Sequence, residues 1–119
     1  MIIQDSKSIK DIQGEFHRMF PGLKMVFYQM KHDDHEGSEK DLEYTNDHKL
    51  MDIRQRHTEG NIEIRPSMTV EALEQSFEEL FGLHIQIFRK SGTVWLQTIT
   101  TDDWTLEKQN EKGVASNHE

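Results

Sequence analysis

Two stretches of the chain follow the same residue plan, and this repetition constrains the fold more than any other feature. SIKDIQGEFHRMF begins at Ser8 and TVEALEQSFEELF begins at Thr69. In both, apolar residues recur at i, i+3, i+7, i+10 and i+11, a spacing that places them on one face of an α-helix. Ser8 and Thr69 are typical N-cap residues, and Asp11 completes a capping box in the first copy. The corresponding apolar residues are Ile9 and Val70, Ile12 and Leu73, Phe16 and Phe77, Met19 and Leu80, and Phe20 and Phe81.

Each predicted helix is followed by a glycine and then by a strand pattern. Gly22 comes after Pro21 in the first copy, and Gly82 follows the second helix directly. Glycine past a helix can adopt the left-handed conformation that ends it, and proline cannot continue it. Residues 23–28 and 83–88 are rich in branched and aromatic residues, and apolar side chains recur at every second position in both. These are Leu23, Met25 and Phe27 in the first run and Leu83, Ile85 and Ile87 in the second, which indicates two strands.

Short apolar alternations also precede both helices, at Ile2-Ile3 and at Ile62 and Ile64. Further along, DHKLMDIR from Asp47 resembles DWTLEKQN from Asp103, and we expect each to form a short helical turn capped by its aspartate. In the second copy Asp102 is the alternative cap. The segment KDLEYT, near Leu42, is the expected partner strand of the first copy.

The order strand, helix, strand, strand is therefore expected twice. This order predicts an α+β fold of internally duplicated β-α-β-β units, with two helices on one face of a mostly antiparallel sheet. A ferredoxin-like sheet with added strands fits this plan, and a β-grasp-like arrangement is the alternative. All six phenylalanines lie in the two units, so we expect the core to be built from them. We expect one domain over residues 1–113, with repeats of about 1–58 and 61–113, and a disordered tail at 114–119.

A β-hairpin is predicted around Ser91-Gly92, because glycine supplies the positive φ of a tight turn. With this turn, Phe88 faces Trp95 and His84 faces Ile99. One face of the hairpin then carries apolar residues directed at the core. These residues are Ile85, Ile87, Val94 and Leu96.

The opposite hairpin face is the candidate site. It carries Phe88, Trp95 and Ile99 next to His84. An apolar patch rimmed by polar groups often marks a contact surface for another protein. The alternative is that this face is covered by a loop, by the tail or by Trp104.

The residue types exclude several classes of chemistry. The chain has no cysteine, which excludes thiolate nucleophiles, disulfides and zinc–thiolate sites. No G-x-S-x-G, P-loop or G-x-G-x-x-G pattern occurs. The segment from His32 to Glu36 has residue types that suit a metal ion, but its spacing and composition are typical of a solvated loop. We therefore expect no catalytic, cofactor-binding or metal-ligating residues, and whether His32–Glu36 binds a metal stays open.

The formal net charge is −8, which disfavours nucleic-acid binding because the phosphate backbone would be repelled. A local basic patch would be needed, and the candidates are Arg54, Arg56, Arg65 and Arg89. The glutamates of the second helix are expected to form a solvated outer face. No run of apolar residues approaches a membrane span, and the N-terminus lacks the pattern of a signal peptide. A cytoplasmic protein without a membrane partner is expected.

Segments of the chain resemble an uncharacterised family of small bacterial proteins. The resemblance is carried by FRKSGTVWLQTITTDDWTLEKQN, FPGLKMVFYQ and LMDIR, and it covers about Ile9 to Gly113. It implies a single-domain protein and no particular activity, cofactor or catalytic residue. Together these features favour a non-enzymatic module that binds a protein partner or associates with itself. The alternative is a small enzyme or ligand-binding protein with its site between the two repeats.

Overall fold

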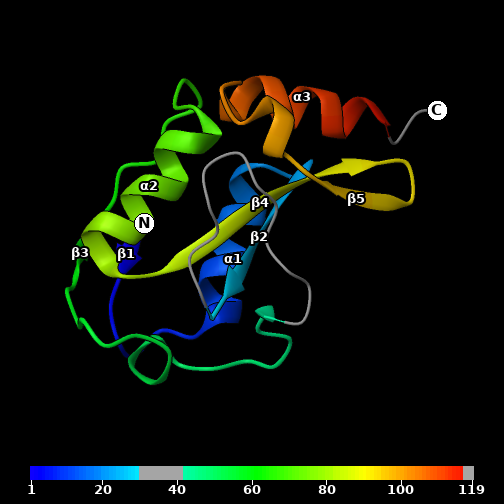
Figure 1. Ribbon diagram of the computed structural model, residues 1–119. Coiled ribbons are helices and arrows are strands. Elements are labelled where there is room, and N and C mark those ends of the chain that lie inside the picture. The colour runs from blue at the N-terminus through cyan, green and yellow to red at the C-terminus, as the bar shows by residue number, and fades with distance from the viewer. Residues whose placement is uncertain (30–41, 117–119) are drawn as a thin grey trace.

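The computed structural model of the chain describes residues 1–29 and 42–116 and confirms the α+β class. Within these residues the strands form two antiparallel sheets (Figure 1). The single ferredoxin-like sheet is therefore not observed. The smaller sheet pairs β1 (Ile2–Ile3) with β3 (Gly60–Asn61), and the larger has the order β2 (Leu23–Tyr28), β4 (His84–Ser91), β5 (Val94–Gln97). The helices are α1 (Ile9–Met19), α2 (Val70–Phe81) and α3 (Leu106–Ala115), with short 3-10 turns η2 (Leu50–Asp52) and η3 (Ile99–Thr101).

The first two helices begin where the sequence predicts. The Ser8 hydroxyl accepts the Asp11 N–H at 3.1 Å, and the Asp11 carboxylate accepts the Ser8 N–H at 3.0 Å, so the capping box is formed. The Thr69 hydroxyl accepts the Ala72 N–H at 3.1 Å. Gly82 ends α2 with φ of 65°, the left-handed conformation that glycine adopts without strain.

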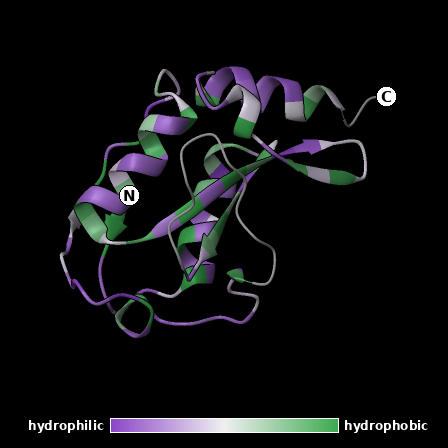
Figure 2. Ribbon diagram, viewed as in Figure 1, coloured by the Kyte–Doolittle hydropathy of each residue, from purple (hydrophilic) through white to green (hydrophobic). Residues whose placement is uncertain are grey.

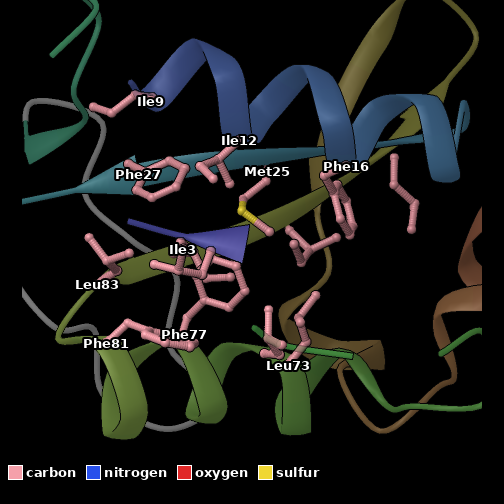
Figure 3. Packing of buried hydrophobic residues seen from close by; sticks show 14 of the residues in the cluster. Ile3, Ile9, Ile12, Phe16, Met25, Phe27, Leu73, Phe77, Phe81 and Leu83 are labelled. Carbon is pink, nitrogen blue, oxygen red and sulfur yellow. The ribbon is translucent and has the colours of Figure 1, made fainter. Parts of the chain in front are cut away.

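The two helices pack their apolar faces into one core (Figure 3). Phe16 and Phe77 hold corresponding positions in the two helices, and both are fully buried. Met19 and Leu80, which the pattern placed on the same apolar stripe, are exposed at the helix ends. The core also takes alternate residues of the two long strands. These are Leu23, Met25 and Phe27 of β2, and Ile85 and Ile87 of β4.

Strands β2 and β4 pair through corresponding positions. Val26 lies opposite Gln86, its counterpart in the other unit, and the register is symmetric on both sides of this pair. In the smaller sheet, the corresponding positions Met1 and Ile62 are also joined to each other. The Met1 amino group donates to the Ile62 carbonyl at 2.9 Å, and the Ile62 N–H donates back to the Met1 carbonyl at 2.8 Å. In both sheets, corresponding positions of the two segments therefore pair with each other.

The weaker similarity between DHKLMDIR and DWTLEKQN also corresponds to matching contacts. The Ile9 N–H donates to the His48 carbonyl at 2.8 Å, and in the second half the Val70 N–H donates to the Trp104 carbonyl at 3.1 Å.

The predicted aspartate cap of α3 is wrong. Thr105 is the N-cap, and its hydroxyl accepts the Lys108 N–H, which leaves Asp102 and Asp103 outside the helix.

Near Leu42, where a partner strand is expected, the described residues form a single isolated β-bridge and no strand. Glu43 bridges Tyr28 at the end of β2, and the Tyr44 N–H donates to the Phe27 carbonyl at 2.9 Å. The segment His32–Glu36, discussed above as a candidate metal-binding loop, lies outside the described residues. The described part of the first unit therefore consists of the residues up to 29 and those from 42 onward.

Helix α3 corrects the predicted C-terminal boundary. It continues to Ala115, and the Ser116 hydroxyl donates to the Gly113 carbonyl at 2.7 Å, so a domain end at 113 with a disordered tail from 114 is wrong for residues 114–116. The helix crosses the start of β2 at Gly22. A Cβ on this glycine would lie 2.6 Å from the Asn110 carbonyl oxygen, so glycine is needed here for the close approach of α3 rather than for a left-handed helix end.

The hairpin between β4 and β5 has a different register from the predicted one. Ser91 pairs with Val94 around a Gly92-Thr93 turn, so Phe88 lies opposite Gln97 and Lys90 lies opposite Trp95. Moving the turn by one residue keeps the alternation of side chains, so Phe88 and Trp95 still lie on the same face. The prediction that Val94 and Leu96 belong to the core is wrong, because both are exposed. Their exposed fractions are 53% for Val94 and 43% for Leu96.

Candidate functional site

Two of the four predicted site residues come together. Phe88 and Trp95 are half-buried on the sheet face that points away from the core, near the hairpin end. His84 starts β4 opposite Tyr28, four residues from Phe88, which is about 13 Å along a strand. Ile99 lies in η3, after the end of β5, and does not pair with His84. The candidate site is therefore centred on Phe88 and Trp95.

Lys24 joins the two aromatic rings, and the sequence analysis did not identify it. Its Nζ lies 5.3 Å from the centroid of the Phe88 ring and 5.0 Å from that of Trp95. A cation over an aromatic ring contributes about 0.5–1 kcal/mol at an exposed position. Lys24 stands opposite Phe88 in the register of β2 with β4, so only the long-range pairing reveals this contact. We call the group Lys24, Phe88 and Trp95 the aromatic face.

A pocket of about 480 Å³ adjoins the aromatic face, between α1 and the outer edge of β2. This volume lies in the range of about 300–1,000 Å³ that is usual for small-molecule sites. Trp95 and Lys24 line one side, and the polar side chains of α1 line another. The lining residues are Gln13, Gly14, His17, Lys24, Met25, Val26, Glu43, Tyr44, Thr45 and Trp95.

Side chains of α1 form hydrogen bonds with carbonyl groups on the outer edge of β2. Gln13 donates through Nε2 to the Met25 carbonyl at 2.9 Å. His17 lies 2.8 Å through Nδ1 from the Leu23 carbonyl, which only accepts, so Nδ1 carries the proton. The His17 ring also meets the Trp95 ring edge-on, with centroids 6.4 Å apart. These contacts hold the pocket wall in place and restrict the pairing of another strand at this edge.

Trp104 does not cover the aromatic face. Arg89, whose side chain alternates with that of Phe88 and so points to the other side of the sheet, lies 5.7 Å from the Trp104 ring centroid. Lys108 and Lys112 of α3 lie 4.0 and 5.7 Å from the same centroid. Trp104 therefore belongs to the helix-covered side of the sheet.

The arginines that could have formed a basic patch serve mainly structural contacts. Arg54 is buried and binds Asp5 at 2.7 Å, and it also donates to the Phe81 carbonyl at 2.9 Å. Arg56 donates to the last carbonyl groups of α2, and Arg65 pairs with Glu63 at 3.0 Å. Each of these three side chains is engaged in a hydrogen bond or an ion pair with another residue of the chain.

The acidic helix face differs from the prediction at Glu74, which is buried rather than solvated. Its carboxylate accepts the Ile87 N–H at 3.0 Å, at the point of β4 where β5 has already ended. Burial raises the pKa of Glu74 to about 8, and the nearby negative charges of Asp102 and Glu71 act in the same direction. Neither Glu74 nor Asp102 lines the pocket beside Trp95, so this pair has no access to a ligand bound there.

Residues 1–29 and 42–116 contain no group of three histidine, aspartate or glutamate side chains that could hold a metal ion. Their helices are also too short or too polar to cross a membrane. Comparison of the chain with protein-family models, with curated proteins and with solved structures finds no match. The resemblance to a bacterial family therefore stays a prediction, and the candidate site rests on its geometry.

Proposed function

We propose that the protein is a non-enzymatic protein-interaction module that binds a partner through the aromatic face. The observation that carries this proposal is the meeting of half-buried Phe88 and Trp95 around Lys24, next to an open pocket. Aromatic side chains supply most of the binding energy in many interfaces, because they bury a large apolar area with little loss of conformational freedom.

The pocket and the rings are suited to different parts of one partner. A side chain of the partner can enter the pocket beside His17 and Tyr44, while an apolar segment covers Trp95 and Phe88. Lys24 contacts both rings in the unbound protein, and this contact lowers the cost of ordering them on binding. The buried carboxylates lie elsewhere, which argues for recognition rather than for acid–base catalysis at this site.

A comparison of two lysine variants tests the proposal. Trp95→Lys removes the central ring, and Val114→Lys places the same charge on an exposed apolar residue of α3. Immobilised wild-type protein and the two variants are used to capture proteins from a lysate of the native host, and each captured protein is then purified and titrated by calorimetry. We expect the Val114→Lys variant to bind like the wild type. Trp95→Lys should weaken binding about 30-fold, as for a hot spot worth about 2 kcal/mol.

Equal affinity of the Trp95→Lys variant and the wild type, with unchanged circular dichroism spectra, would contradict a role for the aromatic face. Loss of binding in Val114→Lys alone would place the interface on α3 instead. The variants are comparable because both replace an accessible apolar side chain by lysine.

The volume of the pocket favours a second candidate function, the binding of a small ligand between the first unit and Trp95. A ligand that saturates the site at 100 times its Kd would stabilise the fold by about 2.7 kcal/mol. A thermal-unfolding screen with metabolites should then find a compound that raises Tm in the wild type and in Glu79→Gln, but not in His17→Ala. No stabilising compound, or an equal shift in His17→Ala, would count against this candidate.

Two further properties remain predictions that accompany this proposal. The matching contacts of the two halves support descent from one duplicated unit. The acidic composition, without cysteine, supports a cytoplasmic location.

A further inference from the structure

Strand β5 forms one edge of the larger sheet. The Thr98 N–H donates to the Ile87 carbonyl at 3.2 Å, which fixes the alternation of hydrogen bonds between β4 and β5. In this alternation Val94 and Leu96 direct their backbone groups to β4, whereas Trp95 directs its N–H and its carbonyl away from the sheet. Among the described residues, no hydrogen bond of these two Trp95 groups is observed. An edge with an unpaired donor and an unpaired acceptor is a template for another strand.

The side chains around this edge are apolar and accessible. Val94 and Leu96 flank Trp95 on the helix-covered side of the sheet and are about half exposed. In Figure 2 β5 appears as a hydrophobic strand beside the hydrophilic end of β4, and Figure 1 shows the hairpin extending away from α1 and α2. No charged residue occurs from Gly92 to Thr101, although 30% of the chain is charged. Natural sheet edges commonly carry a lysine, a proline or a bulge that prevents pairing, and β5 carries none of these.

We propose that a second copy of this chain pairs with the β5 edge, antiparallel and with Trp95 on the twofold axis. The proposal rests on the proposed function and names the partner and register of a self-associating form. The N–H of each Trp95 donates to the carbonyl of the other, which satisfies both outward groups with two hydrogen bonds. Val94 of one copy then lies opposite Leu96 of the other, and this apolar pair occurs twice. The result is a continuous six-stranded sheet across the two molecules, since each contributes β2, β4 and β5.

The edge fits a second copy better than an unrelated strand for two reasons. An isologous contact needs a surface that complements itself under a twofold rotation. The order Val94, Trp95, Leu96 is apolar on both sides of the central backbone groups and meets this condition. The strand is also uncharged, so two copies approach without repulsion between the paired residues.

The expected association is reversible. A four-residue strand edge buries much less than the roughly 800 Å² per partner of a stable interface. The sedimentation coefficient of the wild type should therefore rise with protein concentration toward the value of a dimer. A wild type that remains monomeric over the whole concentration range overturns the proposal.

Charge placement tests the register. Leu96→Lys puts a charge opposite Val94, and we expect dimerisation at least 10-fold weaker. The double variant Val94→Glu with Leu96→Lys creates two Glu–Lys pairs in this register, and it should recover dimerisation in a salt-dependent manner. If the two leucines faced each other instead, the double variant would place lysine opposite lysine and stay monomeric. A dimer that is insensitive to Leu96→Lys, or a monomeric double variant, overturns the proposed pairing.

Cysteine cross-linking gives a second measurement that does not depend on charge. The natural chain has no cysteine, so an introduced one is unique. In a mixture of Val94→Cys and Leu96→Cys proteins, we expect the mixed disulfide dimer to exceed both homodimers, because directly opposed residues have suitably close Cβ atoms. A predominance of either homodimer overturns the register. The dimer and the proposed function are tested by different variants. If Leu96→Lys abolishes dimerisation but still binds a captured partner, the two properties are separate. The proposed function fails if Trp95→Lys leaves partner binding intact.

Discussion

The buried carboxyl of Glu74 should make the stability of the protein fall as the pH rises. In the folded state the pKa of Glu74 is about 8, whereas its ordinary value is 4.5. Between these values the folded chain keeps a proton that the unfolded chain releases, so each pH unit costs about 1.4 kcal/mol of stability. Over the interval from 4.5 to 8 the loss amounts to about 5 kcal/mol.

Glu74→Gln removes this dependence and keeps the local geometry. The amide oxygen of glutamine can still accept the Ile87 N–H, and the side chain has almost the same volume. We therefore expect the variant to be more stable than the wild type at pH 8. The advantage should grow by about 1.4 kcal/mol per pH unit above 4.5, and it should level off above pH 8.

Urea unfolding followed by circular dichroism at pH 5, 6, 7, 8 and 9 measures this difference. Glu79→Gln is the matched control, because Glu79 is an exposed glutamate on the same helix. Its stability relative to the wild type should change little over the same range. A difference between Glu74→Gln and the wild type that is constant across this pH range would show that Glu74 is ionised in the folded protein, and the reasoning from burial would be refuted.

Two further predictions concern packing. Gly22→Ala should lower the free energy of unfolding by about 1–3 kcal/mol, because the added methyl group meets the backbone of α3. Gly14→Ala is its control, since a Cβ there contacts only an arginine side chain at 3.5 Å, and it should stabilise α1 by up to about 1 kcal/mol. Equal effects in the two urea titrations would count against the close approach of α3. Arg54→Met should cost about 3 kcal/mol, because it removes the guanidinium from Asp5, which retains His57, and leaves the Phe81 carbonyl without this donor; a loss below about 1 kcal/mol would contradict this role.

The local sequence predicts α1 and α2 well because their signals are local. A cap, a helical period and a terminating glycine all lie within one short segment, as at Ser8 and Gly82. The hairpin register was missed by one residue at the turn. Two-residue hairpin turns need a positive φ at their first central position, and the structure places Gly92 there with φ of 60°, whereas the predicted turn would have placed Ser91 at that position.

The rest of the candidate site depends on pairing between distant segments. Lys24 reaches the two rings only because β2 aligns with β4 in one register. Glu74 accepts the Ile87 N–H, which is left for it because Thr98, just after β5, bonds the Ile87 carbonyl. The amphipathic pattern of α2 gives no sign of this, since a glutamate on a helix is usually solvated. Phe88 and Trp95 were identified as a pair because side-chain alternation survives the error in register.

The pairing of Val26 with Gln86 has a consequence for which halves of the chain pair during folding. Because counterparts face each other, the contacts that join β2 to β4 resemble those that would join two equivalent strands of different molecules, and such a pairing of like halves would compete with the native pairing. Only the second unit continues into a long helix, since η2 has three residues where α3 has ten. The contact of α3 with Gly22 therefore needs one half of each kind, and it favours the pairing of unlike halves over the pairing of two like halves.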